Sequence, residues 1–244
     1  MCGRRTDPAL LLALALFTGI PAWAKKSTFD NRSGIGFTLR GGATAAPEMD
    51  FAARPQSSAR GYAVLAGIDP FVDFGNFVIR GQAAVVLPPD VQGTGGSGTG
   101  AFGDKAESTV LLYGGQLQLI PWISQARTSR IYLAGGLGLA TIYVTQTRTY
   151  TGGATSVSYT AKARTTRPYT TGAMGLEAFL VQNYVLQIEG GYRDLHAHEL
   201  HYTTSGDARG ATPGTGAVAR DDQGTPQAYG FSGLYASVAF SLVF

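Results

Sequence analysis

The sequence predicts an all-β protein that forms an eight-stranded antiparallel up-and-down transmembrane β-barrel. Three observations predict this fold. The last segment, 234–244, has an apolar residue at every second position, as a strand does when one face contacts lipid. Seven earlier segments alternate in a similar way, and the connections between the eight segments are alternately short and long. Beyond the N-terminal region no run of about 18 apolar residues occurs, so no spanning helix is predicted.

Residues 1–24 have the features of a cleaved secretory signal peptide. Two arginines precede an apolar stretch at 9–20, and 21–24 supplies the small residues of a cleavage site. The barrel domain is then 25–244. The single cysteine, Cys2, would leave with the signal, so we expect no disulfide bond and no thiol chemistry.

The first four strands are predicted at 34–43, 61–72, 77–87 and 108–120, each long enough to cross a bilayer when tilted. Alternate apolar positions predict their lipid-facing side: Ile35, Phe37, Leu39, Val64, Ala66, Ile68, Phe77, Ile79, Ala83, Val85, Leu111, Leu117 and Leu119. The intervening positions predict the inward side: Thr38, Arg40, Asp69, Arg80, Gln82, Gln116 and Gln118.

The last four strands are predicted at 130–147, 168–181, 184–195 (with a possible end at 202) and 228–244. Their lipid-facing residues are Ile131, Leu133, Leu137, Leu139, Met174, Leu176, Leu180, Leu186 and Ile188, together with the alternating C-terminal set. The inward side carries Glu177, Gln187, Glu189 and Arg193.

Two kinds of connection join these strands. Residues 73–76, 121–129 and 182–183 are short turns. Long polar loops are predicted at 44–60, 88–107, 148–167 and 203–227. Loops sorted in this way lie at opposite ends of an up-and-down barrel. In a bacterial outer membrane the long loops face outside and the short turns face the periplasm.

Six charged residues in the middle of strands fall on the inward side: Arg40, Asp69, Arg80, Glu177, Glu189 and Arg193. A lipid-facing charge costs a few kcal/mol near the bilayer midplane. An eight-stranded barrel is just wide enough for side chains to fill it, so buried charges there must pair or contact water. We expect a salt-bridged network that fills the barrel. The alternative is a narrow water or ion path whose ion pairs exchange partners.

Aromatic residues gather near the predicted strand ends and suggest two girdles at the membrane surfaces. The girdle on the short-turn side would contain Phe71, Phe74, Phe77, Trp122, Phe179, Tyr184 and Phe244. The girdle on the long-loop side would contain Tyr62, Tyr143, Tyr169, Tyr192 and Tyr229.

The segment 175–195 combines a G-x-E strand, a short turn with Asn183 and an acidic-aromatic strand. It resembles the penultimate hairpin of the small outer-membrane β-barrel family of the OmpA, OmpX and opacity-protein type. The C-terminal residues Val238, Phe240, Leu242 and Phe244 resemble the signal read by the outer-membrane assembly machinery. The resemblance implies a monomeric integral protein of the cell outer membrane in contact with its lipid and lipopolysaccharide. No residue follows Phe244, so we expect no peptidoglycan-binding domain.

The three histidines, His196, His198 and His201, lie within six residues and are weak metal candidates. On a strand His196 and His198 share one face and His201 lies on the other, whereas a closed zinc site takes four ligands. We therefore predict a solvated strand extension and no metal site. Some small outer-membrane barrels modify lipid A, but the His-x-Ser arrangement of the deacylase among them is absent here. The sequence therefore predicts no enzyme.

Paired glycines occur at 41–42, 114–115, 135–136 and 190–191, but no strand-to-helix transition follows them. We expect no nucleotide or other cofactor. The formal net charge of +3 gives no indication of a nucleic-acid partner. The third long loop carries Arg148, Lys162, Arg164 and Arg167 and no acid. This patch would either contact phosphates of the outer leaflet or be merely solvated.

The function predicted first is a structural or surface-interaction role through the four long loops, with an extracellular ligand that the sequence does not name. The alternative is transport of ions or small apolar solutes, as in OmpW-like proteins. The inward side of the fifth strand, with Ala134, Gly136, Gly138 and Ala140, is small and apolar and favours a conduit.

Overall fold

The computed structural model describes residues 28–29, 34–45, 48–49, 62–96, 101–152, 155–207, 210–221 and 224–244. The predicted signal peptide at 1–24 and most of the predicted loop at 44–60 lie outside the described residues. Every regular element in the described part is a strand. A helix long and apolar enough to cross a membrane is absent from these residues.

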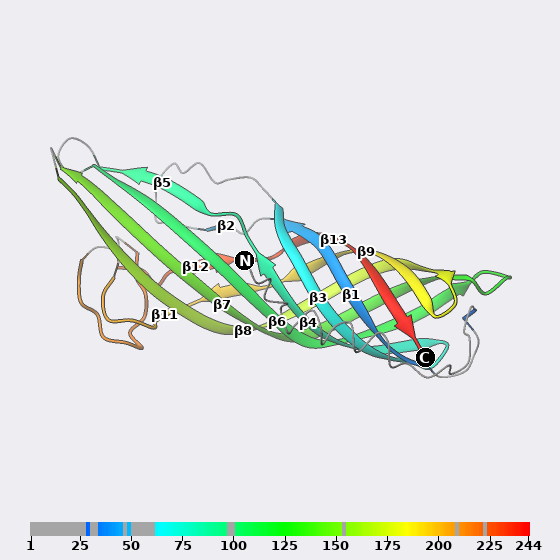
Figure 1. Ribbon diagram of the computed structural model, residues 1–244. Helices are drawn as coiled ribbons and strands as arrows, with labels where there is room; N and C mark the ends of the chain where they lie inside the picture. Colours follow the sequence, from blue (N-terminus) through cyan, green and yellow to red (C-terminus); the bar gives the residue numbers. More distant parts are fainter. Residues whose placement is uncertain are drawn as a thin grey trace, which may run out of the picture.

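Eight strands of the described chain form a closed antiparallel ring (Figure 1). Their bounds are β1 Gly34–Ala45, β3 Tyr62–Asp73, β4 Phe77–Leu87, β6 Ala101–Ile123, β7 Ser129–Gly152, β8 Thr155–Val181, β9 Tyr184–Asp194 and β13 Gly233–Val243. Each strand pairs with the next in the chain, and the last strand, β13, also pairs with β1 and so closes the ring. The predicted eight-stranded up-and-down barrel is confirmed.

The other strands of the described chain lie at the end of the barrel opposite the short turns, which we call the long-loop end. β5 (Val91–Gly95) forms a hairpin with β6. β10 (His196–His198), β12 (Ala228–Gly230) and β2 (Glu48–Met49) form a small second sheet, and β11 (His201–Tyr202) pairs with β8. The last predicted strand, 228–244, is therefore interrupted at residues 231–232.

Two of the predicted long loops are wrong, because most of 88–107 and 148–167 is strand. β7 and β8 continue as one hairpin to Gly152 and Thr155, and Figure 1 shows β6, β7 and β8 extending far beyond β1 and β13. The extension is rich in Thr, a β-branched residue that suits a strand. A strand outside the membrane needs no apolar outer face, so its polar composition resembles that of a loop.

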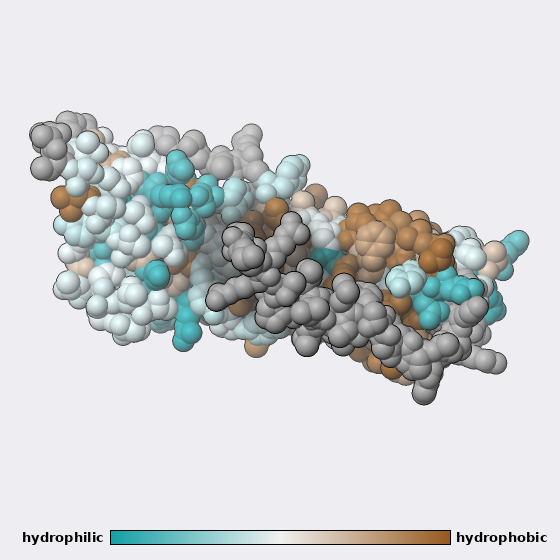
Figure 2. Space-filling model, in the orientation of Figure 1, coloured by the Kyte–Doolittle hydropathy of each residue, from teal (hydrophilic) through white to brown (hydrophobic). Residues whose placement is uncertain are grey.

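The predicted faces are confirmed by burial. None of the predicted lipid-facing residues of the first seven strands is buried, and Ile35, Leu137 and Met174 are among the most exposed. The predicted inward residues are buried, apart from Gln82, Ala134, Gly136 and Gly138, which are half-buried. Figure 2 shows the apolar surface as a brown band near the short-turn end, while the long-loop half is pale to teal.

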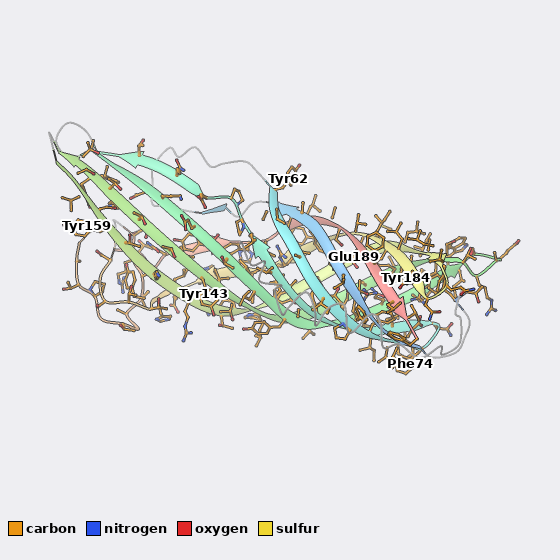
Figure 3. The ribbon with its side chains drawn as sticks, viewed as in Figure 1. Tyr62, Phe74, Tyr143, Tyr159, Tyr184 and Glu189 are labelled. Atoms are coloured by element: carbon orange, nitrogen blue, oxygen red, sulfur yellow. The ribbon has the colours of Figure 1, made fainter. Side chains whose placement is uncertain are left out.

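The aromatic girdles are only partly as predicted. Phe74, Phe77, Trp122, Tyr184, Tyr62, Tyr143 and Tyr192 are exposed. Figure 3 shows Phe74 and Tyr184 toward the short-turn end, and Tyr62 and Tyr143 farther toward the long-loop end. In contrast, Phe71, Tyr169 and Tyr229 are buried, and Phe179 is partly buried against the interior. Phe71 is buried because side chains alternate along a strand, and Phe71 lies on the same inward side of β3 as Asp69.

The C-terminal strand alternates as predicted over most of its length. Leu234, Val238 and Phe240 are exposed. Leu242 departs from the prediction, because only 6% of its surface is exposed. Its register partners on the two neighbouring strands are Phe37 and Tyr184, large aromatic residues that flank it.

The apolar band predicts how the barrel responds to an added charge. Leu137 is 72% exposed and lies on β7 midway between Ile131 and Tyr143. We expect Leu137→Arg to lower the free energy of unfolding by about 2–4 kcal/mol, because the guanidinium would face hydrocarbon. Val157→Arg, in the polar extension of β8, is the matched control and should change it by less than about 1 kcal/mol. Urea unfolding in lipid vesicles measures both values, and equal losses would contradict the proposed band.

Candidate functional site

The middle of the barrel holds buried charged side chains of both signs. Arg40, Asp69, Arg80, Glu177, Glu189 and Arg193 are each at most 4% exposed. They project inward from β1, β3, β4, β8 and β9. Figure 3 places Glu189 between the level of Tyr62 and that of Tyr184, within the apolar band. These residues and their partners are called the mid-barrel network below.

Arg40 and Glu189 form one centre of this network. The Arg40 guanidinium lies 2.8 Å from Asp69 and 2.8 Å from Glu189. The Glu189 carboxylate also accepts hydrogen bonds from the hydroxyls of Tyr132, at 2.8 Å, and Tyr235, at 3.1 Å. This one carboxylate therefore ties β9 to β1, β7 and β13.

Arg80 and Glu177 form the second centre. Arg80 lies 3.1 Å from Glu177 and donates hydrogen bonds to Thr38 at 2.9 Å and Gln187 at 2.8 Å. Glu177 also contacts Arg130 at 2.6 Å. The distance from Arg80 to Asp69 is 4.0 Å, which connects the two centres.

Sequence reasoning missed Arg130 and Asp73. Arg130 lies 2.8 Å from Asp73, and both are buried. Arg130 had been placed at the beginning of a strand and Asp73 in a short turn. The alternation of the strand could have predicted that Arg130 points inward, because its neighbour Ile131 is predicted to point outward. Asp73 is the last residue of β3, one position beyond the predicted end.

Arg193 differs from the other charges of the network. Its guanidinium donates a hydrogen bond to the Thr44 hydroxyl at 3.1 Å, and no carboxylate of the described residues lies within ion-pair distance. Its Nε has no hydrogen-bond partner among them. The described network holds four arginines and four carboxylates, so Arg193 balances the charge of the layer without a direct ion pair.

Apolar residues close the network on the short-turn side. Phe29, Phe71, Val78, Val185 and Val243 form a buried cluster there. The Arg130 guanidinium stacks 4.2 Å from the centre of the Phe29 ring, and Arg80 lies 5.3 Å from that of Phe71. These rings shield the cationic groups from water at this end.

A second apolar layer closes the network on the long-loop side. Segments that follow β9 and precede β13 fold inward and bury Leu195, Leu200, Tyr202, Tyr229 and Phe231. They pack against inward residues of the barrel wall: Leu65, Val86, Leu112, Ala140 and Ile142. The charged layer thus lies between two apolar layers in the described chain.

The small apolar face of β7 is filled by an aromatic side chain. A methyl group at Gly138 would lie 2.7 Å from Tyr169 Cε1, and one at Gly114 would lie 2.9 Å from the Tyr169 hydroxyl. Tyr169 also donates a hydrogen bond to Gln82 at 2.7 Å. The glycines therefore make room for this ring, which the sequence had placed in the outer girdle.

The three histidines are exposed and lie at the long-loop end. The rings of His196 and His198 are stacked with centres 6.0 Å apart, and His196 lies 3.1 Å from Asp194. The Nδ1 atom of His201 lies 3.0 Å from the carbonyl oxygen of Gly216. Among the described residues no group of three or more His, Cys, Asp or Glu comes together in a metal-binding arrangement.

Comparisons with known proteins give similarities among solved structures. No family model and no curated protein matches the chain. It is similar to the outer membrane protein OprG from Pseudomonas aeruginosa, at 14% identity over 89% of this chain and 99% of that chain, with a TM-score of 0.46. It is also similar to Neisserial surface protein A, at 10% identity over 86% of this chain and 97% of that chain, with a TM-score of 0.39.

A further similarity is to Ail, the attachment invasion locus protein of Yersinia pestis. The identity is 9%, the alignment covers 87% of this chain and 97% of that chain, and the TM-score is 0.35. We infer the barrel from the strand pairing of this chain, and we infer the chemistry of its interior from the side chains of this chain.

The network predicts a difference between two arginines that carry the same charge. Arg40→Met leaves Asp69 and Glu189 buried without their nearest cation, and we expect it to cost about 3–5 kcal/mol of unfolding free energy. Arg193→Met removes one charge from the same layer but breaks only a hydrogen bond to Thr44. We expect a loss smaller by about 2 kcal/mol. Urea unfolding in vesicles of the two variants tests this, and equal losses would mean that total charge matters more than direct pairing.

Proposed function

We propose that the chain, a small β-barrel of the outer-membrane type, is a non-enzymatic integral membrane protein that acts through its long-loop end. Its export by the signal peptide 1–24 and its insertion by the outer-membrane assembly machinery through Val238, Phe240, Leu242 and Phe244 belong to the same proposal. It works as a monomer and without a cofactor. The ring uses the pairing edges of all eight of its described strands, which supports the monomer.

One observation carries this proposal: the mid-barrel network is interlocked and has apolar layers on both sides. A conduit needs a continuous polar path, whereas Phe71 and Val78 lie below the charges and Leu112 and Ile142 lie above them. The side chains that are accessible to partners are instead those of the extension of β6, β7 and β8. This extension stands clear of the apolar band and is rich in Thr and Tyr.

The long-loop end faces outward in this proposal. The short-turn end has compact turns at 74–76, 124–128 and 182–183, which are typical of the periplasmic side of outer-membrane barrels. The extension of β6, β7 and β8 then projects from the cell surface. An unidentified extracellular ligand would meet its Thr-rich faces.

Transport remains the alternative function, and Arg193 is the observation that favours it. A buried cation that has no carboxylate partner in the described part of the chain is a group that a passing anion could contact. This alternative requires the apolar layer around Leu200 and Tyr229 to open.

Planar bilayer recording separates the two functions. We expect the refolded full-length protein to show no discrete current steps, because apolar layers lie on both sides of the charges. Glu189→Ala should also be silent, since the apolar layers stay in place. Reproducible unitary steps in the wild type that change in Glu189→Ala would contradict the proposal and favour transport.

Cysteine labelling on intact cells tests the orientation. Val157→Cys lies in the β8 extension and Gln125→Cys lies in the turn between β6 and β7, and both positions are exposed. We expect a membrane-impermeant maleimide to label Val157→Cys on intact cells and Gln125→Cys only after the outer membrane is permeabilised. The reverse pattern would overturn the orientation.

A further inference from the structure

A cleft of about 930 Å³ lies beside β8, between the end of its pairing with β9 at Thr170 and its pairing with β11 at Arg164. Its wall includes Tyr143, Arg164, Arg167, Glu199 and His201, together with hydroxyl groups of several threonines. Figure 3 shows Tyr143 on the outer surface of the strands below the tip of the extension. Four of the five named side chains can carry a charge, which sets this cleft apart from the apolar grooves elsewhere on the barrel wall.

The chain builds this cleft by a change of pairing partner. Glu199, between β10 and β11, has a φ of 58°, a backbone conformation that turns the chain out of the small sheet. β11 then returns to β8, where His201 pairs with Arg164. Arg167 holds this corner, because its Nε donates a hydrogen bond to the carbonyl of His198 at 3.0 Å.

The cleft has an excess of positive charge. Arg167 lies 3.7 Å from Glu199, so these two charges largely offset each other. The side chain of Arg164 is exposed, and no carboxylate of the described residues lies within ion-pair distance of it. Lys162, two residues away on the same side of β8, adds a second cation nearby. Arg164 is therefore the cation that remains available to an anionic ligand.

The cleft begins where the apolar band ends. The outward positions of β7 run from Leu137 and Leu139 to Thr141 and Tyr143. On the antiparallel strand β8, Pro168 is the register partner of Leu139, and Arg164 is the register partner of Tyr143. At about 3.3 Å per residue, Arg164 lies roughly 13 Å along the strands from the last apolar pair. This is the level at which the headgroups of a bilayer meet an integral protein.

We propose that this cleft binds a phosphate group of lipopolysaccharide, the phosphorylated glycolipid of the outer leaflet. The planar Arg164 guanidinium matches the oxygens of a phosphate. The exposed hydroxyl of Thr215, also in the cleft wall, supplies a further donor. The acyl chains of the same molecule would lie against Leu137 and Leu139 below. The site rests on the proposed orientation, since only that orientation puts the cleft in the outer leaflet.

Lipid A titration of the refolded full chain in neutral detergent micelles tests the site without reference to orientation. We expect bisphosphorylated lipid A to bind at least about tenfold more tightly than dephosphorylated lipid A. Arg164→Gln should weaken binding of the bisphosphorylated form by about tenfold, because a charge-assisted hydrogen bond is lost. Arg127→Gln, the same change in an exposed turn at the short-turn end, is the control and should leave the affinity unchanged.

Three results would overturn the site. The first is equal affinity for the two forms of lipid A, and the second is an equal effect of Arg164→Gln and Arg127→Gln. The third is binding of any phosphate by the cleft, seen as full displacement of lipid A by millimolar inorganic phosphate or as equal binding of phosphatidylglycerol. If the cysteine labelling described under Proposed function fails, the proposed orientation is wrong. The lipid A affinity measured in micelles is not affected by that result.

Discussion

Closing eight strands into a ring places a constraint on every other part of this structure. The interior of such a ring is narrow, and each strand turns half of its residues into it. Charges that lipid would not tolerate on the outer face collect inside, where they must find partners. Glu189 and Glu177 meet this requirement, and each holds side chains from several strands at once.

The same constraint explains the layers along the barrel axis. Arg40, Arg80 and Arg130 are paired with carboxylates in the middle, where water is least accessible. Aromatic rings such as Phe71 and Tyr169 fill the levels next to the charges, and glycines on neighbouring strands make room for them. The charged layer and the apolar layers on either side of it therefore follow from the same narrow interior.

The membrane boundary changes what each strand must satisfy along its length. Within the band, β7 presents Leu137 and Leu139 to lipid, and beyond it the same strand presents Tyr143 and then threonines. Hydrogen bonding between β7 and β8 continues without interruption across this boundary. The cleft around Arg164 lies at the transition, where the apolar face ends and the polar extension begins. Lipid headgroups and protein side chains of matching polarity meet at this level.

The sequence by itself determined the strand number, the antiparallel order, most of the lipid-facing residues and the inward side of Arg40, Asp69, Arg80, Glu177, Glu189 and Arg193. Alternation and loop spacing are local properties, and they suffice for these features. Tertiary structure alone decided that Arg193 has no carboxylate partner among the described residues, that Arg130 joins Glu177, and that Tyr169 points inward over Gly138. It also decided that residues 148–152 and 155–167 continue as strand. Pairing across the ring depends on register and on distances between residues far apart in the chain, which local pattern does not encode.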